Sequence, residues 1–170
     1  LFVVKYNSSG TKQWTNQLGS SSRDSANGVA TDSSGNVYVT GTTYWELDGN
    51  TSAGNADLFV VKYNSSGTKQ WTKQLGTEKT DEARGVSTDS SGNVYVTGYT
   101  DGGLDGNTSA GRSDLFVVKY NSSGTKQWTK QLGTEDSDFA NGVATDSSGN
   151  VYVTGSTYRN LDGNTSAGNA

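Results

Sequence analysis

The sequence predicts an all-β protein made of repeated four-stranded antiparallel sheets, and two observations lead to this prediction. First, the segment LFVVKYNSSGTKQWT begins at Leu1, Leu58 and Leu115, so the chain consists of three copies of a 57-residue unit, the third of which lacks the last position. Second, each unit contains four short runs of β-branched and aromatic residues that are bounded by turn residues. No stretch repeats its apolar residues at the spacing of a helix.

The first unit shows where the four strands are expected. They are the residue runs 1–6, 11–18, 28–31 and 37–40, the last reaching 43 at its longest. The turn sequences NSSG and DSSGN separate the two members of each pair, and glycine adopts a positive φ there at little cost. We therefore expect two tight hairpins per unit, joined by longer connections at 19–27 and 44–57.

The runs LFVV and VYV are continuously apolar rather than alternating, which indicates that both faces of the sheet are covered. Four-stranded sheets that each pack between two neighbours satisfy this requirement, and the closed form of such an array is a β-propeller. A β-solenoid is the competing architecture. Its coils take roughly 20–30 residues, which fits this long unit of several hairpins less well.

The segment GVATDSSGNVYVTG at residues 28–41, followed by DLFVVKYNSSGTKQW at 57–71, resembles the bacterial SBBP β-propeller repeat. The resemblance covers essentially the whole chain and implies a blade rather than an activity. The unit is also similar to NHL-type blades, which implies that GVATD is the innermost strand, NVYVTG the second, LFVVKYN the third and TKQWTKQLG the outermost. A weaker similarity, in the turn followed by Trp14, is to quinoprotein propellers.

With that strand order, repeats 1–57, 58–114 and 115–170 form one partial propeller of two whole blades and two complementary half-blades. Three blades are too few to close a ring, and open sheet edges invite association. We expect residues 1–18 of one chain to complete the half-blade 142–157 of another. Two chains would then form a six-bladed homodimer and three chains a nine-bladed trimer. The alternative is that the chain is a fragment of a longer array that closes by itself.

The composition narrows the possible functions. The chain has no His and no Cys, so it lacks an imidazole general base, a thiol nucleophile and the usual zinc ligands. Its net charge is −4 with no basic stripe, so no nucleic-acid partner is expected. There is no apolar run long enough to span a membrane, no leader-like segment and no initiating Met, so we expect a mature piece or a fragment. The sequence predicts a protein that is not an enzyme.

The three copies differ mainly at 20–27, 42–46 and 55–56 and the equivalent positions, whereas both hairpin turns are identical in every copy. In a four-stranded blade the two longer connections leave the sheet at the same end, so this variation is expected on one face of the disc. Variable loops on a constant frame are typical of binding surfaces. Drift after duplication is the alternative. The candidate ligand-binding residues are Arg23, Tyr44, Trp45, Arg84, Phe139, Tyr158 and Arg159.

The loop LDGNTSAGNAD is a candidate for calcium binding, because Asp48, Asn50 and Ser52 follow the alternate spacing of a calcium loop and Asp57 lies nearby. The sixth position is Ala53 rather than glycine, and no glutamate stands at the twelfth. A loop that hydrogen-bonds to itself through Asx turns is therefore the preferred interpretation, and no cofactor is expected.

These observations together predict a non-enzymatic propeller scaffold that binds a protein or glycan through its variable loop face. Trp45 is the most informative candidate, because it is the one Trp outside the position repeated in every copy. The alternative is a purely structural module, engineered or recently amplified, with no specific ligand. The resemblance to bacterial repeats implies an extracellular or cell-envelope location.

Overall fold

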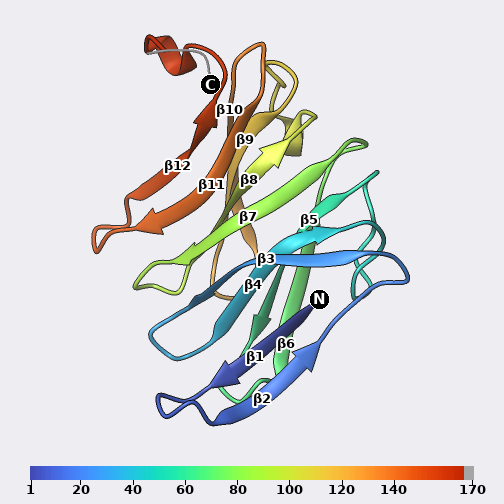
Figure 1. Cartoon of the computed structure of the whole chain (residues 1–170), viewed down its shortest axis with the longest axis vertical. Coiled ribbons are helices and arrows are strands. Elements are labelled where there is room, and N and C mark those ends of the chain that lie inside the picture. Colours follow the sequence, from blue (N-terminus) through green and yellow to red (C-terminus); the bar gives the residue numbers. More distant parts are fainter. Residues whose placement is uncertain (167–170) are drawn as a thin grey trace.

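The computed structural model describes residues 1–166 and shows an all-β chain, as the sequence predicts (Figure 1). The described part of the chain also has two three-residue 3-10 turns, Leu104–Gly106 and Leu161–Gly163. The strands are β1 Phe2–Tyr6, β2 Lys12–Gln17, β3 Asp24–Thr31, β4 Val37–Thr43, β5 Asp57–Tyr63, β6 Lys69–Leu75, β7 Asp81–Thr88, β8 Val94–Thr100, β9 Asp114–Tyr120, β10 Lys126–Leu132, β11 Asp138–Thr145 and β12 Val151–Thr157.

The strands form two four-stranded sheets, in the orders β3-β4-β5-β6 and β7-β8-β9-β10, and two two-stranded sheets, β1-β2 and β11-β12. Every pairing between strands is antiparallel. The four-stranded sheets are the blades, and the two-stranded sheets are called half-blades below. The first strands of successive sheets, β3, β7 and β11, contact one another in turn (Figure 1). These strands are therefore the innermost ones, in the order that the sequence predicts.

The strand expected at 28–31 starts earlier than predicted, because β3 begins at Asp24. Residues 24–26 pair with 41–43 of β4, and a register shift between Ala26 and Gly28 marks a β-bulge. Polar and small residues occupy this half of the strand, so it lacks the apolar run by which the other strands were recognised. A hydrogen bond of 2.6 Å from Thr43 Oγ1 to Asp24 Oδ1 helps to hold it in the sheet.

Each tight hairpin is closed by an Asx turn, which explains why the turn sequences do not vary. Asn7 Oδ1 accepts hydrogen bonds from the backbone N–H groups of Ser9, at 3.1 Å, and Thr11, at 2.9 Å. Asp32 Oδ1 does the same for Ser34 and Asn36 in the other type of hairpin. Replacing either Asx residue removes an acceptor that serves two amides.

The core lies between neighbouring sheets rather than inside any one of them. One apolar cluster joins the two blades and includes Tyr38 and Val60 from the first and Val96 from the second. The other cluster joins the first blade to the β1-β2 half-blade through Val39 and Val3. Because Tyr38 and Val39 are consecutive, this strand buries both of its faces, as its unbroken apolar run predicts.

The tryptophan that recurs in each copy links one sheet to the next. Trp14 Nε1 donates to the carbonyl of Ser65 at 3.2 Å, and Trp71 Nε1 donates to that of Ser122 at 3.4 Å. In each case the acceptor lies in the outer hairpin of the following blade. These two residues are therefore structural links between blades.

Replacing Gly98 with alanine should destabilise the fold, because a Cβ atom there would lie 1.8 Å from the carbonyl oxygen of Glu82 in the paired strand. We expect a loss of about 1–3 kcal/mol in the free energy of unfolding, measured by urea denaturation. Ser90→Ala, in an exposed hairpin, is the control and should leave the midpoint unchanged. Equal midpoints for the two variants would contradict the close packing of β7 against β8.

Candidate binding face

The longer connections gather at one end of the sheets, and the tight hairpins lie at the other (Figure 1). Neighbouring connections also contact each other: Ala56, before β5, forms a parallel bridge with Thr80, before β7. The backbone N–H of Asp81 donates to the carbonyl of Ala56 at 2.8 Å. The connections and the strand ends next to them are called the loop face.

Buried carboxylates at the starts of strands hold the connections of the loop face in place by hydrogen bonds. Asp81 is fully buried, and its carboxylate accepts hydrogen bonds from Thr100 Oγ1 and, at 2.9 Å, from Thr77 Oγ1. Asp57 is also fully buried, and its Oδ2 accepts from Ala53 N at 2.8 Å and from Gln74 Nε2 at 2.7 Å. These aspartates tie the backbone of the connections to the blades, which leaves the outward side chains free to vary.

Three of the seven predicted residues form one contact cluster on this face. The guanidinium carbon of Arg84 lies 4.8 Å from the ring centre of Tyr99 and 5.1 Å from that of Phe139. The Phe139 ring makes edge contacts with Tyr99 at 5.0 Å and with Tyr158 at 6.5 Å. The cluster joins the second blade to the β11-β12 half-blade.

Polar contacts fix the arginine at the centre of this cluster. Arg84 Nη1 donates to Asn141 Oδ1 at 2.8 Å, and Arg84 Nε pairs with Glu82 Oε1 at 3.1 Å. Burial, together with the charges of Glu82 and Asp101, raises the pKa of Tyr99, and the charge of Arg84 opposes this rise. The result is a fixed cation held between aromatic rings.

Sequence reasoning missed Tyr99 and misplaced two other residues. Arg84 and Phe139 were expected in a connection, but they lie on the innermost strands β7 and β11. This follows from the early start of the innermost strand in each sheet. The signal for Tyr99 was available, because its equivalents are Thr42 and Ser156 and the position therefore varies among the copies.

The other predicted residues lie apart from this cluster. Arg23, Tyr44 and Trp45 belong to the first blade, where the backbone N–H of Tyr44 donates to the carbonyl of Arg23 at 3.1 Å. The side chains of Tyr44 and Trp45 are 41% and 55% exposed, so both are accessible in this chain. Six of the seven predicted residues therefore divide into two groups of three, one beside the first blade and one between the second blade and the β11-β12 half-blade.

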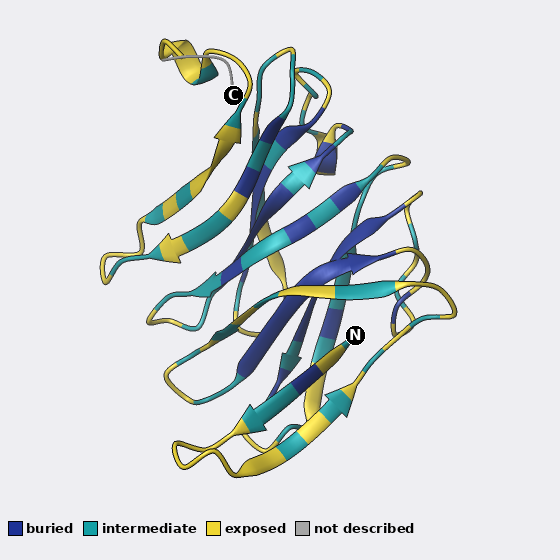
Figure 2. Cartoon of the chain, viewed as in Figure 1, coloured by how far each residue is buried: buried dark blue, intermediate teal, exposed yellow. Residues whose placement is uncertain are grey.

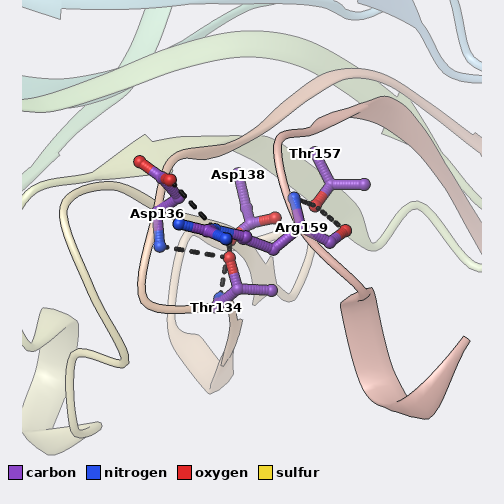
Figure 3. A network of polar contacts seen from close by, with 5 residues as sticks. All are labelled: Thr134, Asp136, Asp138, Thr157 and Arg159. Atoms are coloured by element: carbon purple, nitrogen blue, oxygen red, sulfur yellow. Dashed lines mark hydrogen bonds and ion pairs between the residues drawn. The ribbon is translucent and has the colours of Figure 1, made fainter. Parts of the chain in front are cut away.

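Arg159 lies at the far end of the loop face, in the polar network of Figure 3. Its Nε pairs with Asp136 Oδ2 at 3.2 Å, and its carbonyl accepts from Thr157 Oγ1 at 3.0 Å. Asp138 Oδ2 accepts from the backbone and hydroxyl of Thr134 (Figure 3). An adjacent cavity of about 570 Å³ is lined in part by Tyr158, Arg159 and Asn160.

The candidate calcium residues are engaged in hydrogen bonds of the loop and its neighbouring strand. The Asp48 carboxylate accepts from Lys69 Nζ and, at 2.6 Å, from Thr72 Oγ1. Asn50 Nδ2 donates to the carbonyl of Leu47 at 2.9 Å. In the same loop, Ser52 Oγ donates to the carbonyl of Gly54 at 3.2 Å.

Burial acts to raise the pKa of Asp48, but the hydrogen bonds from Lys69 and Thr72 and the charge of Lys69 lower it overall. Its carboxylate oxygens therefore already face two donors. Within residues 1–166, no three acidic, His or Cys side chains are grouped so that they could hold a metal ion.

The fold and this face together define a protein of β-propeller blades. The chain belongs to the SBBP family of beta-propeller repeats, which it matches three times, at residues 13–44, 70–105 and 127–162. The family assignment confirms the resemblance seen in the sequence. Over residues 1–166, no helix has the length and apolar character needed to cross a membrane.

Two relatives are similar to most of this chain. An uncharacterized WD repeat-containing protein, L264, of Acanthamoeba polyphaga mimivirus is 29% identical over 88% of the chain. The regulatory protein FlaEY of Caulobacter vibrioides is 32% identical over 78% of the chain. The matched regions make up 14% and 15% of these two proteins, so the chain spans about a seventh of their length.

Asp81, which is buried, and Asp89, which lies in a tight hairpin, should have opposite effects on the pH dependence of stability. Burial, the largest cause, and the charge of Asp57 raise the pKa of Asp81 above 3.8, so its ionised form destabilises the fold at neutral pH. Hydrogen bonds from Asn93, Tyr95 and Ser91 outweigh burial and lower the pKa of Asp89, so its ionised form stabilises the fold.

As pH falls from 7 through the pKa values of Asp81 and Asp89, the free energy of unfolding of the wild type should rise relative to that of Asp81→Asn. It should fall relative to that of Asp89→Asn. Urea denaturation at a series of pH values measures both differences. If the two differences in unfolding free energy changed with pH in the same direction, the contrast between Asp81 and Asp89 would be contradicted.

Calcium should leave the melting temperature unchanged, because Lys69 and Thr72 already donate hydrogen bonds to the Asp48 carboxylate. Differential scanning fluorimetry with millimolar CaCl₂, and MgCl₂ as the control, measures this. A rise of several degrees with CaCl₂ alone, abolished by Asp48→Asn, would establish a calcium site in this loop.

Proposed function

We propose that this protein is a non-enzymatic β-propeller scaffold that closes into a ring with a second copy and binds a protein or glycan through its loop face. The observation that carries the binding part is the contact cluster of Arg84, Tyr99, Phe139 and Tyr158. Side chains that differ among the copies build this cluster, whereas the residues that form the frame are repeated.

The chemistry of the cluster suits recognition of a macromolecule. Tyr, Trp and Arg contribute most often to the energy of protein interfaces, because they offer large contact areas together with polar groups. Tyr158 is 52% exposed and Trp45 is 55% exposed, so both present aromatic surface to a partner. The absence of His and Cys from the sequence supports a role without catalysis.

The second candidate is a structural module that assembles and binds nothing else. The open strand edges of the two half-blades favour it, since each edge offers backbone hydrogen-bonding groups to a further strand. Under either role we propose an extracellular or cell-envelope location in a bacterium. The resemblance to bacterial repeats supports this location.

A binding screen separates the two candidates. The purified chain would be applied to a glycan array and to a panel of immobilised secreted proteins. For any ligand found, Tyr158→Ala or Trp45→Ala should weaken binding about tenfold or more, because each substitution removes an exposed aromatic contact.

Ser90→Ala is the matched control, because it lies in an exposed hairpin at the opposite end of the sheets. Unchanged binding by both aromatic variants would place the ligand elsewhere and contradict the loop-face proposal. A screen without any ligand would favour the structural module.

A further inference from the structure

The two half-blades leave complementary strand edges open. Within the first blade, β5 pairs with β4 on one side and with β6 on the other. Its equivalent β1 pairs with β2 alone, and β12, the equivalent of β4, pairs with β11 alone. Each half-blade therefore lacks the pair of strands that the other one contains.

Several residues that are buried in the blades are exposed in the half-blades, as the yellow segments of β1 and β12 show (Figure 2). Phe2 is 66% exposed, whereas its equivalents Phe59 and Phe116 are fully buried. Tyr152 is 56% exposed, whereas its equivalent Tyr38 is fully buried. Because the same side chains occur in both settings, the difference measures what a neighbouring sheet would cover.

A cavity marks the space that the missing strands would fill. It has a volume of about 550 Å³ and lies between β1 and β3, lined by apolar residues that include Phe2, Val4 and Val29. In the corresponding space between the first and second blades, Tyr38 of β4 packs in one apolar cluster with Val60 of β5 and Val86 of β7. Val29, the equivalent of Val86, is 63% exposed.

Polar groups at the two open edges also lack the partners that their equivalents have. In the first blade, Leu47 N donates to Gln74 Oε1 at 2.9 Å, and Asp48 pairs with Lys69. The second blade repeats both contacts, through Leu104 N with Gln131 and Asp105 with Lys126.

The equivalent groups in the two half-blades are Leu161 and Asp162 after β12, and Gln17 and Lys12 on β2. Within the described residues, the side chains of Lys12, Gln17 and Asp162 make no hydrogen bond or ion pair. The donors and acceptors on one open edge therefore match those on the other.

We propose that β12 of one copy adds to the edge of β1 of a second copy, in the register that both blades already use. In β4-β5, Val39 stands opposite Val61, and in β8-β9, Val96 stands opposite Val118. The same register places Val153 opposite Val4 of the second copy. It also brings Asp162 to Lys12, and the backbone N–H of Leu161 to Gln17, of the second copy.

This inference rests on the ring closure proposed above and specifies its contacts. In the proposed ring, β12 of each copy pairs with β1 of the other copy, so two copies joined twice complete both half-blades and form six blades with two-fold symmetry. A second copy is the occupant because its half-blade supplies the matching apolar strands, a Lys for Asp162, and an amide acceptor for the backbone N–H of Leu161.

Engineered cysteines test the register, because the chain contains none of its own. The double variant Val4→Cys with Val153→Cys places two thiols directly opposite each other across the join, within reach of a disulfide. The control, Val4→Cys with Thr154→Cys, is one residue out of register, so its thiols would point to opposite faces of the sheet.

Light scattering of the wild type should give about 36 kDa, twice the 17.8 kDa of one chain. After mild oxidation, a non-reducing gel should show a disulfide-linked dimer for the matched pair and about tenfold less for the control. A monomeric mass, a three-copy mass, or a disulfide within one chain would each overturn the two-copy closure. A dimer that links the two pairs equally would overturn the register and leave the proposed ring standing.

A charge exchange adds a readout that a folding defect would not reproduce. Lys12→Glu and Asp162→Lys should each weaken dimerisation about two- to fivefold per join, and the double variant should recover it, since every join then carries the reversed pair. Loss without recovery would overturn this contact. The loop-face screen reads out ligand binding separately, so a failed join and a failed binding function are distinguishable.

Discussion

The organisation of this protein depends on covering both faces of a thin apolar sheet. In β4, Tyr38 packs toward the following blade and Val39 toward the preceding half-blade. A strand with large apolar side chains on both faces is stable only between two neighbours, because either face would otherwise expose apolar surface to water. The repeated tryptophan and the shared apolar clusters hold each sheet against its neighbours. The exposed apolar residues of the half-blades follow from the same constraint.

The sequence predicted strands best where a continuous run of apolar residues fits only a strand that is buried on both faces. The continuous apolar runs predicted β4 and β5, and the order of strands within a blade was correct. The first half of β3 was missed, because Asp24 and its neighbours are polar or small and are held by pairing with a distant strand. The β-strand propensity of a short segment does not reveal such pairing.

The candidate site could be predicted only in part, and from a different signal. Differences among the copies indicated one variable face and identified Arg84, Phe139 and Tyr158, which do lie in contact. That Trp45 lies on another sheet, and that Tyr99 completes the cluster, depends on how neighbouring blades sit against each other. Side-chain contact between blades is a property of the assembled fold.

The near-identity of the repeats has a consequence for how the chain folds. β5 and β9 share the sequence DLFVVKY, and β6 and β10 share KQWTKQL, so within these two pairs a strand cannot distinguish its proper neighbour from the equivalent one by sequence. The bias toward the proper neighbour comes from the shorter connection. Residues 64–68 join β5 to β6, whereas pairing β5 with β10 would close residues 64–125, a roughly twelvefold longer loop that costs about 2 kcal/mol more in loop entropy. Strands of other molecules compete on similar terms as concentration rises. The order of the blades is therefore encoded in the length of the connectors, and dilution during refolding protects it.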